Sequence, residues 1–364
     1  MPKYVLYTAV LPAYREHCMA LVGQVLGIQY MAYTGSAHLD PTVRTGISKN
    51  LYTPIRNHRF ASGRVLLQTG KWMSALRSST TILDLNPRSL TAWYLLIARR
   101  ILGKRTLLWG HLHPQNGGRT RTASLRRSMR RISSGTILYG YDSVETARAE
   151  LLGGPVWVAP NSLYPRSELG FDKNFARNRI LYVGRLENAK KLDLLVAAFA
   201  HSELYSKGYQ LTIVGHGSQA DHLQDIAREL SVDTYCQFIG RTYDAKIVRE
   251  LYNEAICSVS PGYAGLSLTQ SIGFGVPVLV ADNELHSPEI ELDRTGAVHY
   301  FTSDSVQSLA SSLCEIAAVD WTSSATGWSN TVARYYCAES MAAGLIAAFR
   351  NEEQSLGKDG WPKA

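Results

Sequence analysis

The sequence predicts an α/β protein made of two doubly wound, parallel-sheet domains. Short β-rich runs alternate with helical stretches along the 364 residues, and such alternation is typical of parallel sheets with helices on both faces. A looser segment near residues 164–178 divides these runs into two sets. The length fits two domains, and a hydrophobic content of 45% is enough for two sizeable cores.

Seven strands are expected before the looser segment and five after it. The first set comprises residues 3–9, 27–33, 64–68, 80–85, 106–110, 135–139 and 155–159. The second set comprises residues 179–184, 210–215, 235–239, 256–260 and 277–281. Helical patterns fill the gaps, and a last amphipathic one covers about 332–350. We therefore expect an N-terminal domain over 1–165, a C-terminal domain over 175–335, and a final helix within 336–364 that packs back on the N-terminal domain.

The composition indicates a cytoplasmic protein. Its longest apolar run, "TAWYLLIA", is followed by Arg99, Arg100 and Lys104 and is too short to span a bilayer. The N-terminus reads as a strand and resembles no signal peptide. Five cysteines lie scattered without a CxxC pair, which argues for reduced thiols and against a cysteine zinc site.

The net charge of +8 is concentrated in one run, "RTRTASLRRSMRR", from Arg119 to Arg131. An ordinary solvated helix face is the usual explanation of such a run; the alternatives are an anionic membrane surface or nucleic acid. No helix-turn-helix, zinc-finger or RNA-binding signature accompanies it, so nucleic acid is not expected. Of the two binding partners the membrane surface is favoured, with Arg126, Arg127, Arg130 and Arg131 facing the lipid.

Ligands of open α/β sheets bind beyond the carboxyl ends of the strands, so the residues that follow each strand are informative. In the second half these segments are "GRLENAK" (184–190), "GHGS" (215–218) and "GRTYDAK" (240–246). Arg185 and Lys190 stand five apart across a turn, where a guanidinium and an ammonium can hold two phosphates. Alone, each is more readily explained as an ordinary surface cation.

A further segment, "PGYAGLSLTQSIGFGVPVL" (261–279), reads as a glycine loop, a short helix over 266–274, and a strand. The first turn of that helix has no acidic residue, although a helix N-terminus favours negative charge. A bound anion would supply it. Together with Arg185 and Lys190, this predicts a phosphate site at the strand ends of the second domain.

In the first half, the strand ends carry "PAYR" (12–15), "NPR" (86–88) and "WGHLHP" (109–114). His111 directly follows an apolar strand, so a catalytic role and a structural one are about equally supported. His111 and His113 form an HxH pair, but no third ligand lies near in sequence, and no metal site is predicted.

Several segments together resemble the family 4 retaining glycosyltransferases of bacterial surface-polysaccharide type. The segments are "ILYVGRLENAKKLDLLVAAFA", "LTIVGHGS", "CQFIGRTYDAKIVRELYNEAICSVSPG" and "GFGVPVLVADNELHSPEI", in the order and spacing of that family. "VWVAPNSLY", "LLWGH" and "TILYGYDSVETARAEL" match it upstream. The resemblance covers about 105–350 well and 1–80 poorly.

This resemblance implies a GT-B fold, with two Rossmann-like domains facing a cleft and the donor nucleotide held mainly by the second. It places Arg185 and Lys190 on the donor diphosphate and His111, as the catalytic residue, opposite the transferred sugar. The remaining implied donor-binding residues are Arg241, Gly262, Tyr263, Ala264, Gly265, Leu266 and Gln270.

The sequence departs from the family at two of these positions. Gly262 and Gln270 stand eight apart where the family usually has two glutamates, the first at the sugar hydroxyls and the second at the ribose. A glutamine oxygen still accepts a hydrogen bond, more weakly than a carboxylate. Gly262 offers no side chain, so the sugar transferred is left open.

The resulting hypothesis is a hexosyltransferase-type glycosyltransferase, peripheral on the inner face of the plasma membrane, active in surface polysaccharide or lipopolysaccharide assembly. It would move a sugar from a nucleotide-diphosphate donor to a glycan or lipid-linked acceptor, with no cofactor. Independence of metal is expected, because the sequence has no DxD motif and its cations suffice for the diphosphate. The alternatives are a nucleotide-sugar epimerase on the same fold and a non-catalytic sugar-nucleotide-binding protein.

Overall fold

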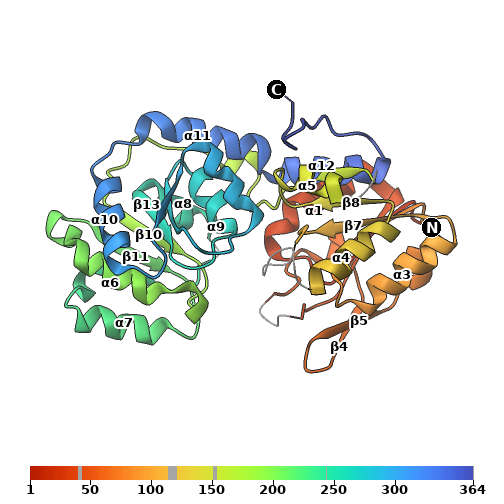
Figure 1. Cartoon of the computed structure of the whole chain (residues 1–364), viewed down its shortest axis with the longest axis horizontal. Coiled ribbons are helices and arrows are strands. Elements are labelled where there is room, and N and C mark those ends of the chain that lie inside the picture. The colour runs from red at the N-terminus through yellow and green to blue at the C-terminus, as the bar shows by residue number, and fades with distance from the viewer. Residues whose placement is uncertain (40–42, 114–120, 151–153, 243, 364) are drawn as a thin grey trace. The chain divides into compact units, whose positions relative to one another are not determined.

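The computed structural model describes residues 1–39, 43–113, 121–150, 154–242 and 244–363 (Figure 1). It divides into two compact units. The first comprises Met1–Arg166 and Tyr335–Ala364, and the second comprises Ser167–Arg334. The chain thus passes from the first unit to the second at 166–167 and returns at 334–335.

A seven-stranded parallel sheet forms the centre of the first unit, in the order β3-β2-β1-β6-β7-β8-β9. The direction of winding reverses between β1 and β6. The strands are β1 (Tyr4–Thr8), β2 (Tyr30–Thr34), β3 (Thr53–Pro54), β6 (Thr80–Asp84), β7 (Arg105–Gly110), β8 (Gly135–Leu138) and β9 (Val156–Val158).

Helices cover both faces of this sheet. α1 and α12 pack together over one core, which contains Leu6, Trp109, Met341 and Phe349. α2, α3 and α4 contribute to the core that contains Val5, Leu95 and Met129. The helices of the unit are α1 (Glu16–Leu26), α2 (Trp72–Arg77), α3 (Leu90–Ile101), α4 (Arg121–Ile132), α5 (Ser143–Glu150) and α12 (Ala338–Arg350).

The strand expected over 64–68 lies outside the parallel sheet. It is β5 (Val65–Thr69), which pairs antiparallel with an unexpected strand, β4 (Arg56–Phe60). Ala61, Ser62 and Gly63 all have positive φ, so the chain reverses between the two strands and forms a hairpin.

The second unit has a six-stranded parallel sheet in the order β12-β11-β10-β13-β14-β15. Its winding reverses between β10 and β13. β15 was not expected, because this short edge strand is only half-buried at its centre. The strands are β10 (Arg179–Val183), β11 (Gln210–Val214), β12 (Cys236–Ile239), β13 (Ala255–Ser260), β14 (Val278–Ala281) and β15 (Val298–Phe301).

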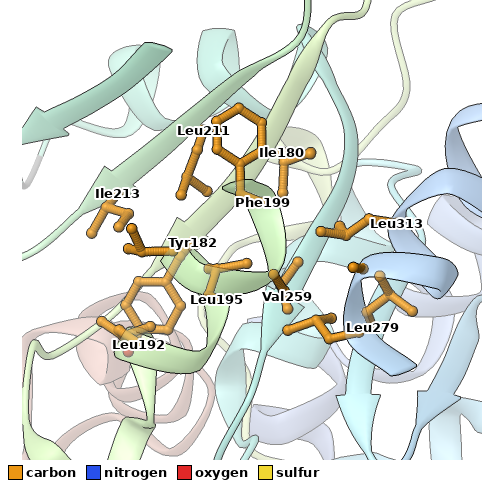
Figure 2. Close-up of a cluster of buried hydrophobic side chains, with 14 of the residues drawn as sticks. Ile180, Tyr182, Leu192, Leu195, Phe199, Leu211, Ile213, Val259, Leu279 and Leu313 are labelled. Atoms are coloured by element: carbon orange, nitrogen blue, oxygen red, sulfur yellow. The ribbon is translucent and has the colours of Figure 1, made fainter. Parts of the chain in front are cut away.

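One face of this sheet is covered by α6 and α10, which pack against each other. Figure 2 shows the core beneath them, where Phe199 and Leu195 of α6 lie near Ile180 and Val259 of the central strands. The helices of the unit are α6 (Leu192–Ser202), α7 (Ala220–Glu229), α8 (Ala245–Asn253), α9 (Leu266–Gly273), α10 (Val306–Ala317) and α11 (Thr322–Tyr335).

The single helix expected over 332–350 is two helices. α11 ends at Tyr335 and α12 begins at Ala338, where the extended backbone of Cys337 interrupts the helix. The break coincides with the return of the chain to the first unit, and α12 then packs on α1 and β9.

None of the described helices is both long and apolar enough to cross a membrane. All five cysteines are free thiols, and Cys18, Cys257 and Cys337 are buried.

Candidate functional site

The candidate site of the second unit lies where the winding of its sheet reverses. β10 and β13 are parallel neighbours there, so their carboxyl ends meet at one edge. β10 is followed by Gly184, Arg185 and the 3-10 turn Asn188–Lys190. β13 is followed by the glycine loop, residues 261–265, which leads into α9.

Lys190 joins the two strand ends. Its Nζ donates a hydrogen bond to the carbonyl oxygen of Tyr263 at 2.6 Å and lies 5.1 Å from the centre of the Tyr263 ring. Burial, then the charge of Arg185, lower the pKa of Lys190 to about 8, against the opposing effect of Glu284. Burial and the nearby guanidinium both destabilise the charged form of Lys190, and a bound anion would offset these effects.

The glycine loop also approaches the Lys190 segment through its backbone. A Cβ on Gly262 would lie 2.3 Å from the carbonyl oxygen of Ala189 and 3.2 Å from Cα of Lys190. No side chain fits at 262 unless one of the two segments moves. A glutamate at this position, as in the family that the sequence resembles, would therefore clash with the Lys190 segment.

A third glycine-bearing strand end lies against the first. Gly215 follows β11, and a Cβ there would be 1.9 Å from the carbonyl oxygen of Gly184. The N–H of Leu186 also donates to the carbonyl oxygen of His216 at 3.1 Å. Arg241 is more distant from Lys190 in the sheet, because it follows the edge strand β12, two strands from β10. Its side chain is exposed.

His286, which sequence reasoning missed, anchors the glycine loop. Its Nδ1 accepts a hydrogen bond from the N–H of Ala264 at 3.1 Å, and its Nε2 donates to the carbonyl oxygen of Ala281 at 2.8 Å. The N–H of Ser287 donates to the carbonyl oxygen of Ala264 at 3.0 Å. Both polar groups of Ala264 are thus held by the segment that follows β14. In the sequence, the signal that could have identified His286 was its place in the segment after the strand expected over 277–281.

Lys191 also belongs to this framework and was missed. Its left-handed backbone (φ 51°) turns the chain into α6. Its Nζ lies 2.6 Å from Glu284 Oε1 and 2.6 Å from Asp304 Oδ1. Lys191 is therefore an ion-pairing residue that ties three strand-end segments together, whereas its neighbour Lys190 bonds to a neutral carbonyl.

The N-terminus of α9 matches the sequence expectation at Leu266. Among the described residues no side chain caps it, and its first turn holds no acid. Gln270 lies deeper in the helix and is buried, and its Oε1 accepts a hydrogen bond from the Tyr252 hydroxyl at 3.2 Å. A ribose hydroxyl would have to compete with Tyr252 for that oxygen.

In the first unit, polar side chains gather where β1, β6, β7 and β8 end. The N–H of Ala9 donates to Asp84 Oδ2 at 2.6 Å across the reversal of winding. Arg15 is buried, lies 4.4 Å from the centre of the Trp109 ring, and donates to the Tyr139 hydroxyl at 3.0 Å.

His111 lies beside this group, with its ring 4.8 Å from that of Tyr139. Burial, with the charges of Arg126 and Arg15, lowers the pKa of His111 to about 4, so its imidazole is neutral near pH 7. His113 instead lies 3.7 Å from Glu150 Oε1. The two histidines of the HxH pair thus have different neighbours, Tyr139 for His111 and Glu150 for His113. Over the described part of the chain no group of three or more His, Cys, Asp or Glu side chains could hold a metal ion.

Residues 121–131 of the basic run lie in α4, and three of its arginines bond to other residues of the first unit. Arg126 donates to the carbonyl oxygen of His111 at 2.7 Å. Arg127 and Arg130 bond to Glu150 at 3.2 and 2.6 Å. The prediction that Arg130 faces lipid is wrong, because its side chain is buried in this ion pair. Arg119 lies outside the described residues.

Comparisons with known proteins agree with this architecture. Residues 168–317, within the second unit, match the family described as glycosyl transferases group 1. An uncharacterized glycosyltransferase of Haemophilus influenzae is 29% identical over 122 residues, 33% of each chain. The UDP-N-acetylglucosamine–peptide N-acetylglucosaminyltransferase GtfA subunit of Limosilactobacillus reuteri is 28% identical over 107 residues, 29% of this chain and 20% of that one. The match spans a third or less of these curated relatives.

Solved structures resemble the chain over nearly its whole length. Anabaena HepE in complex with UDP has a TM-score of 0.71 at 12% identity, covering 96% of this chain and 100% of that one. The sucrose-phosphate synthase of Thermosynechococcus elongatus has 0.67 at 14%, covering 96% and 98%. The lipopolysaccharide outer core galactosyltransferase WaaB has 0.62 at 12%, covering 96% and 99%.

The predicted α/β GT-B fold is confirmed by these likenesses and by the two parallel sheets. The matched domain supports a GT-B glycosyltransferase. Membership of family 4, retention of configuration, the hexosyl type and a role in surface polysaccharides stay predictions.

Proposed function

We propose that this protein is a retaining glycosyltransferase of family 4 type that moves a hexosyl group from a nucleotide-diphosphate sugar to a glycan or lipid-linked acceptor. The observation that carries the proposal is the junction of Lys190 with the glycine loop at the reversal of winding in the second unit. The match of residues 168–317 to glycosyl transferases group 1 supports it.

The diphosphate of the donor would lie between Lys190, Arg185 and the N-terminus of α9. Two cations and free helix N–H groups are favourable partners for an anion. As the bond to the sugar breaks, the leaving diphosphate gains charge, and these groups stabilise it more strongly than they stabilise the substrate. The leaving group itself would accept the proton of the acceptor hydroxyl, so no carboxylate nucleophile is required. We also propose that no metal or other cofactor takes part, which predicts activity that survives EDTA.

His111 is proposed as a catalytic residue of the first unit. Its neutral imidazole can donate one hydrogen bond to a sugar hydroxyl without adding positive charge. His111→Ala should therefore reduce turnover while the affinity for a bare nucleoside diphosphate, which rests on the second unit, stays near that of the wild type.

A role in lipopolysaccharide or another surface polysaccharide, on the inner face of the plasma membrane, completes the proposal. Its support is the sequence resemblance and the fold shared with the lipopolysaccharide galactosyltransferase WaaB.

The test is incubation of the full chain with a panel of nucleotide sugars, with and without lipid-linked and glycan acceptors. A transferase releases the nucleoside diphosphate, and an acceptor stimulates the release strongly. A new sugar nucleotide formed without acceptor would indicate an epimerase instead. Binding without any product, for every donor and acceptor tried, would leave a non-catalytic sugar-nucleotide-binding protein and contradict the proposal.

A further inference from the structure

Helix α3 presents apolar side chains to solvent along its outer face. Its inner face is buried through Ala92, Leu95 and Leu96. The outer face carries Leu90, Tyr94, Ile97 and Ile101, spaced four, three and four residues apart, and all are exposed, Ile101 to 80%. The outer face of a surface helix is ordinarily polar, so this apolar stripe indicates a binding surface.

Neighbouring elements extend the stripe. The rings of Trp72 in α2 and Tyr94 in α3 lie 5.3 Å apart, which places the exposed Met73 of α2 beside the helix. Leu66 of β5 bridges to Ser89, just before α3, so the β4–β5 hairpin, which carries the exposed Phe60, adjoins the N-terminal end of α3 (Figure 1). We call these six exposed residues the α3 surface: Phe60, Met73, Leu90, Tyr94, Ile97 and Ile101.

The surroundings of the α3 surface are strongly basic. Between residues 41 and 141 the sequence has eighteen lysines and arginines and one acid, Asp84. Exposed cations stand at both ends of α3 and of α2, and on the hairpin; they are Arg59, Arg64, Lys71, Arg77, Arg88, Arg100 and Lys104. An apolar centre with a cationic rim therefore lies on the first unit.

We propose that the α3 surface docks this protein on an anionic phospholipid bilayer. Aliphatic and aromatic side chains would enter the headgroup boundary, and the surrounding cations would meet lipid phosphates. Charge complementarity favours this partner over a second copy of the chain, since a symmetric pair would place the two basic rims against each other. It is also favoured over nucleic acid, whose interfaces are polar and would leave the aliphatic centre unused.

The docking surface is thus α3 and its neighbours instead of the arginine run of α4. Arg126, Arg127 and Arg130 bond to other residues of the first unit, so fewer arginines are available to lipid than the sequence of the run suggests. This inference does not rest on the proposed sugar transfer, because lipid binding can be measured without donor or acceptor.

The test is co-sedimentation of the full chain with vesicles of phosphatidylcholine and phosphatidylglycerol, and with vesicles of phosphatidylcholine alone. We expect binding to the anionic vesicles only, weakening as salt rises. Arg100→Ser with Lys104→Ser should weaken partitioning about fivefold per cation and reduce the salt dependence. Ile97→Ser with Ile101→Ser should abolish binding even at low salt.

Matched controls come from the second unit. Leu230→Ser with Ile247→Ser removes two exposed apolar side chains, and Lys173→Ser with Lys207→Ser removes two exposed cations. Both pairs should bind vesicles as the wild type does. Thermal unfolding verifies that each variant is folded, and the single variant Ile101→Ser, at the most exposed position, repeats the test with the least disturbance.

Three results would overturn the proposal. The first is a wild type that does not sediment with anionic vesicles, or that sediments equally with neutral ones. The second is undiminished binding by the folded isoleucine variants, or equal losses in the controls. The third is a wild-type dimer that Ile97→Ser with Ile101→Ser converts to a monomer without any lipid binding, which would identify a second copy as the partner.

Discussion

Lys190 Nζ lies 2.6 Å from the carbonyl oxygen of Tyr263, and this bond joins the ends of two neighbouring strands, β10 and β13. The ammonium is half-buried near Arg185 and is bonded to a neutral group instead of a carboxylate. Its neighbour Lys191, by contrast, has two carboxylate partners. The lysine whose ammonium bonds to a neutral carbonyl is thus the one that faces the glycine loop, which is the arrangement expected of a site for an anion.

The first prediction concerns the stability of the unliganded protein. The pKa of Lys190 is lowered from 10.5 to about 8, so between these values the unfolded chain binds a proton that the folded chain releases. The stability that this residue contributes therefore rises as pH increases from about 8 towards 10.5. Lys190→Met lacks this pH-dependent contribution. The Tm of the variant minus that of the wild type should therefore be larger at pH 7 than at pH 10.

Thermal unfolding in matched buffers measures the effect, and Lys207→Met, at an exposed lysine of the same unit, is the control. A difference between wild type and Lys190→Met that is the same at both pH values would show that Lys190 has an ordinary, solvated environment.

The second prediction separates two glycines of one loop. A Cβ at Gly262 meets the carbonyl oxygen of Ala189 at 2.3 Å, whereas a Cβ at Gly265 meets Ser287 Oγ at 3.5 Å, an ordinary contact. Gly262→Ala should cost about 1–3 kcal/mol of unfolding free energy, as overpacking typically does. Gly265→Ala, which meets no such contact, should cost less unfolding free energy than Gly262→Ala. Denaturant unfolding of both variants is the measurement, and equal effects would contradict the close approach of residues 189 and 262.

A related expectation concerns Gly262→Glu, which introduces the glutamate usual in the family that the sequence resembles. Because the backbone of Ala189 occupies the space, the variant should lose donor binding and not gain activity.

The third prediction assigns His286 a positioning role. Its two hydrogen bonds require a neutral ring with the proton on Nε2. His286→Ala should raise KM for the donor with a smaller change in kcat, because the glycine loop loses its anchor while the cations remain. His286→Asn, whose amide oxygen can accept from the N–H of Ala264, should restore part of the affinity.

Hydrogen exchange at the Ala264 amide distinguishes this role from a general loss of stability. In His286→Ala that amide should exchange faster, while amides of the central strands β10 and β13 stay protected. Uniformly faster exchange would indicate that His286 only supports the fold.

The fourth prediction follows from His111. Its pKa is lowered from 6.5 to about 4, so between these values the unfolded state takes up a proton that the folded state does not. Its contribution to stability is complete above pH 6.5 and declines as pH falls towards 4. The Tm of His111→Asn should decline less steeply than that of the wild type over this range. Parallel curves would contradict the burial of the imidazole.

Much of the fold was predictable because strand, turn and helix alternate with clear local signals. Every strand expected from the sequence is present, although residues 27–29 form a 3-10 turn and 64–68 belong to a hairpin. β3, β4 and β15 were missed because none of them has a run of buried apolar residues. β3 has two residues, β4 is largely exposed, and β15 has four residues with only its two ends buried. The break between α11 and α12 was missed because the amphipathic pattern continues through Tyr336 and Cys337.

The candidate site was predictable where chemistry follows a strand directly, as at Arg185, Lys190 and the glycine loop. His286 and Lys191 required the structure, because their roles depend on segments distant in sequence, around Ala264 and Asp304. For the basic run, the sequence alone was misleading about how many charges are exposed. Composition revealed its charge, but only the fold shows that Glu150, twenty residues after Arg130, neutralises part of it.

Calorimetric titration of nucleoside diphosphates tests the central claim most directly. A diphosphate that binds the wild type should bind Lys190→Ala more weakly by about 1.5–3 kcal/mol, the usual contribution of a hydrogen bond to a charged group. Arg185→Lys should also bind more weakly, since an ammonium cannot reproduce the two-pronged contact of a guanidinium. Lys207→Ala, at an exposed lysine outside the site, should bind as the wild type does. If Lys190→Ala and Arg185→Lys bind the diphosphate as tightly as the wild type, Lys190, Arg185 and the glycine loop do not form the donor site.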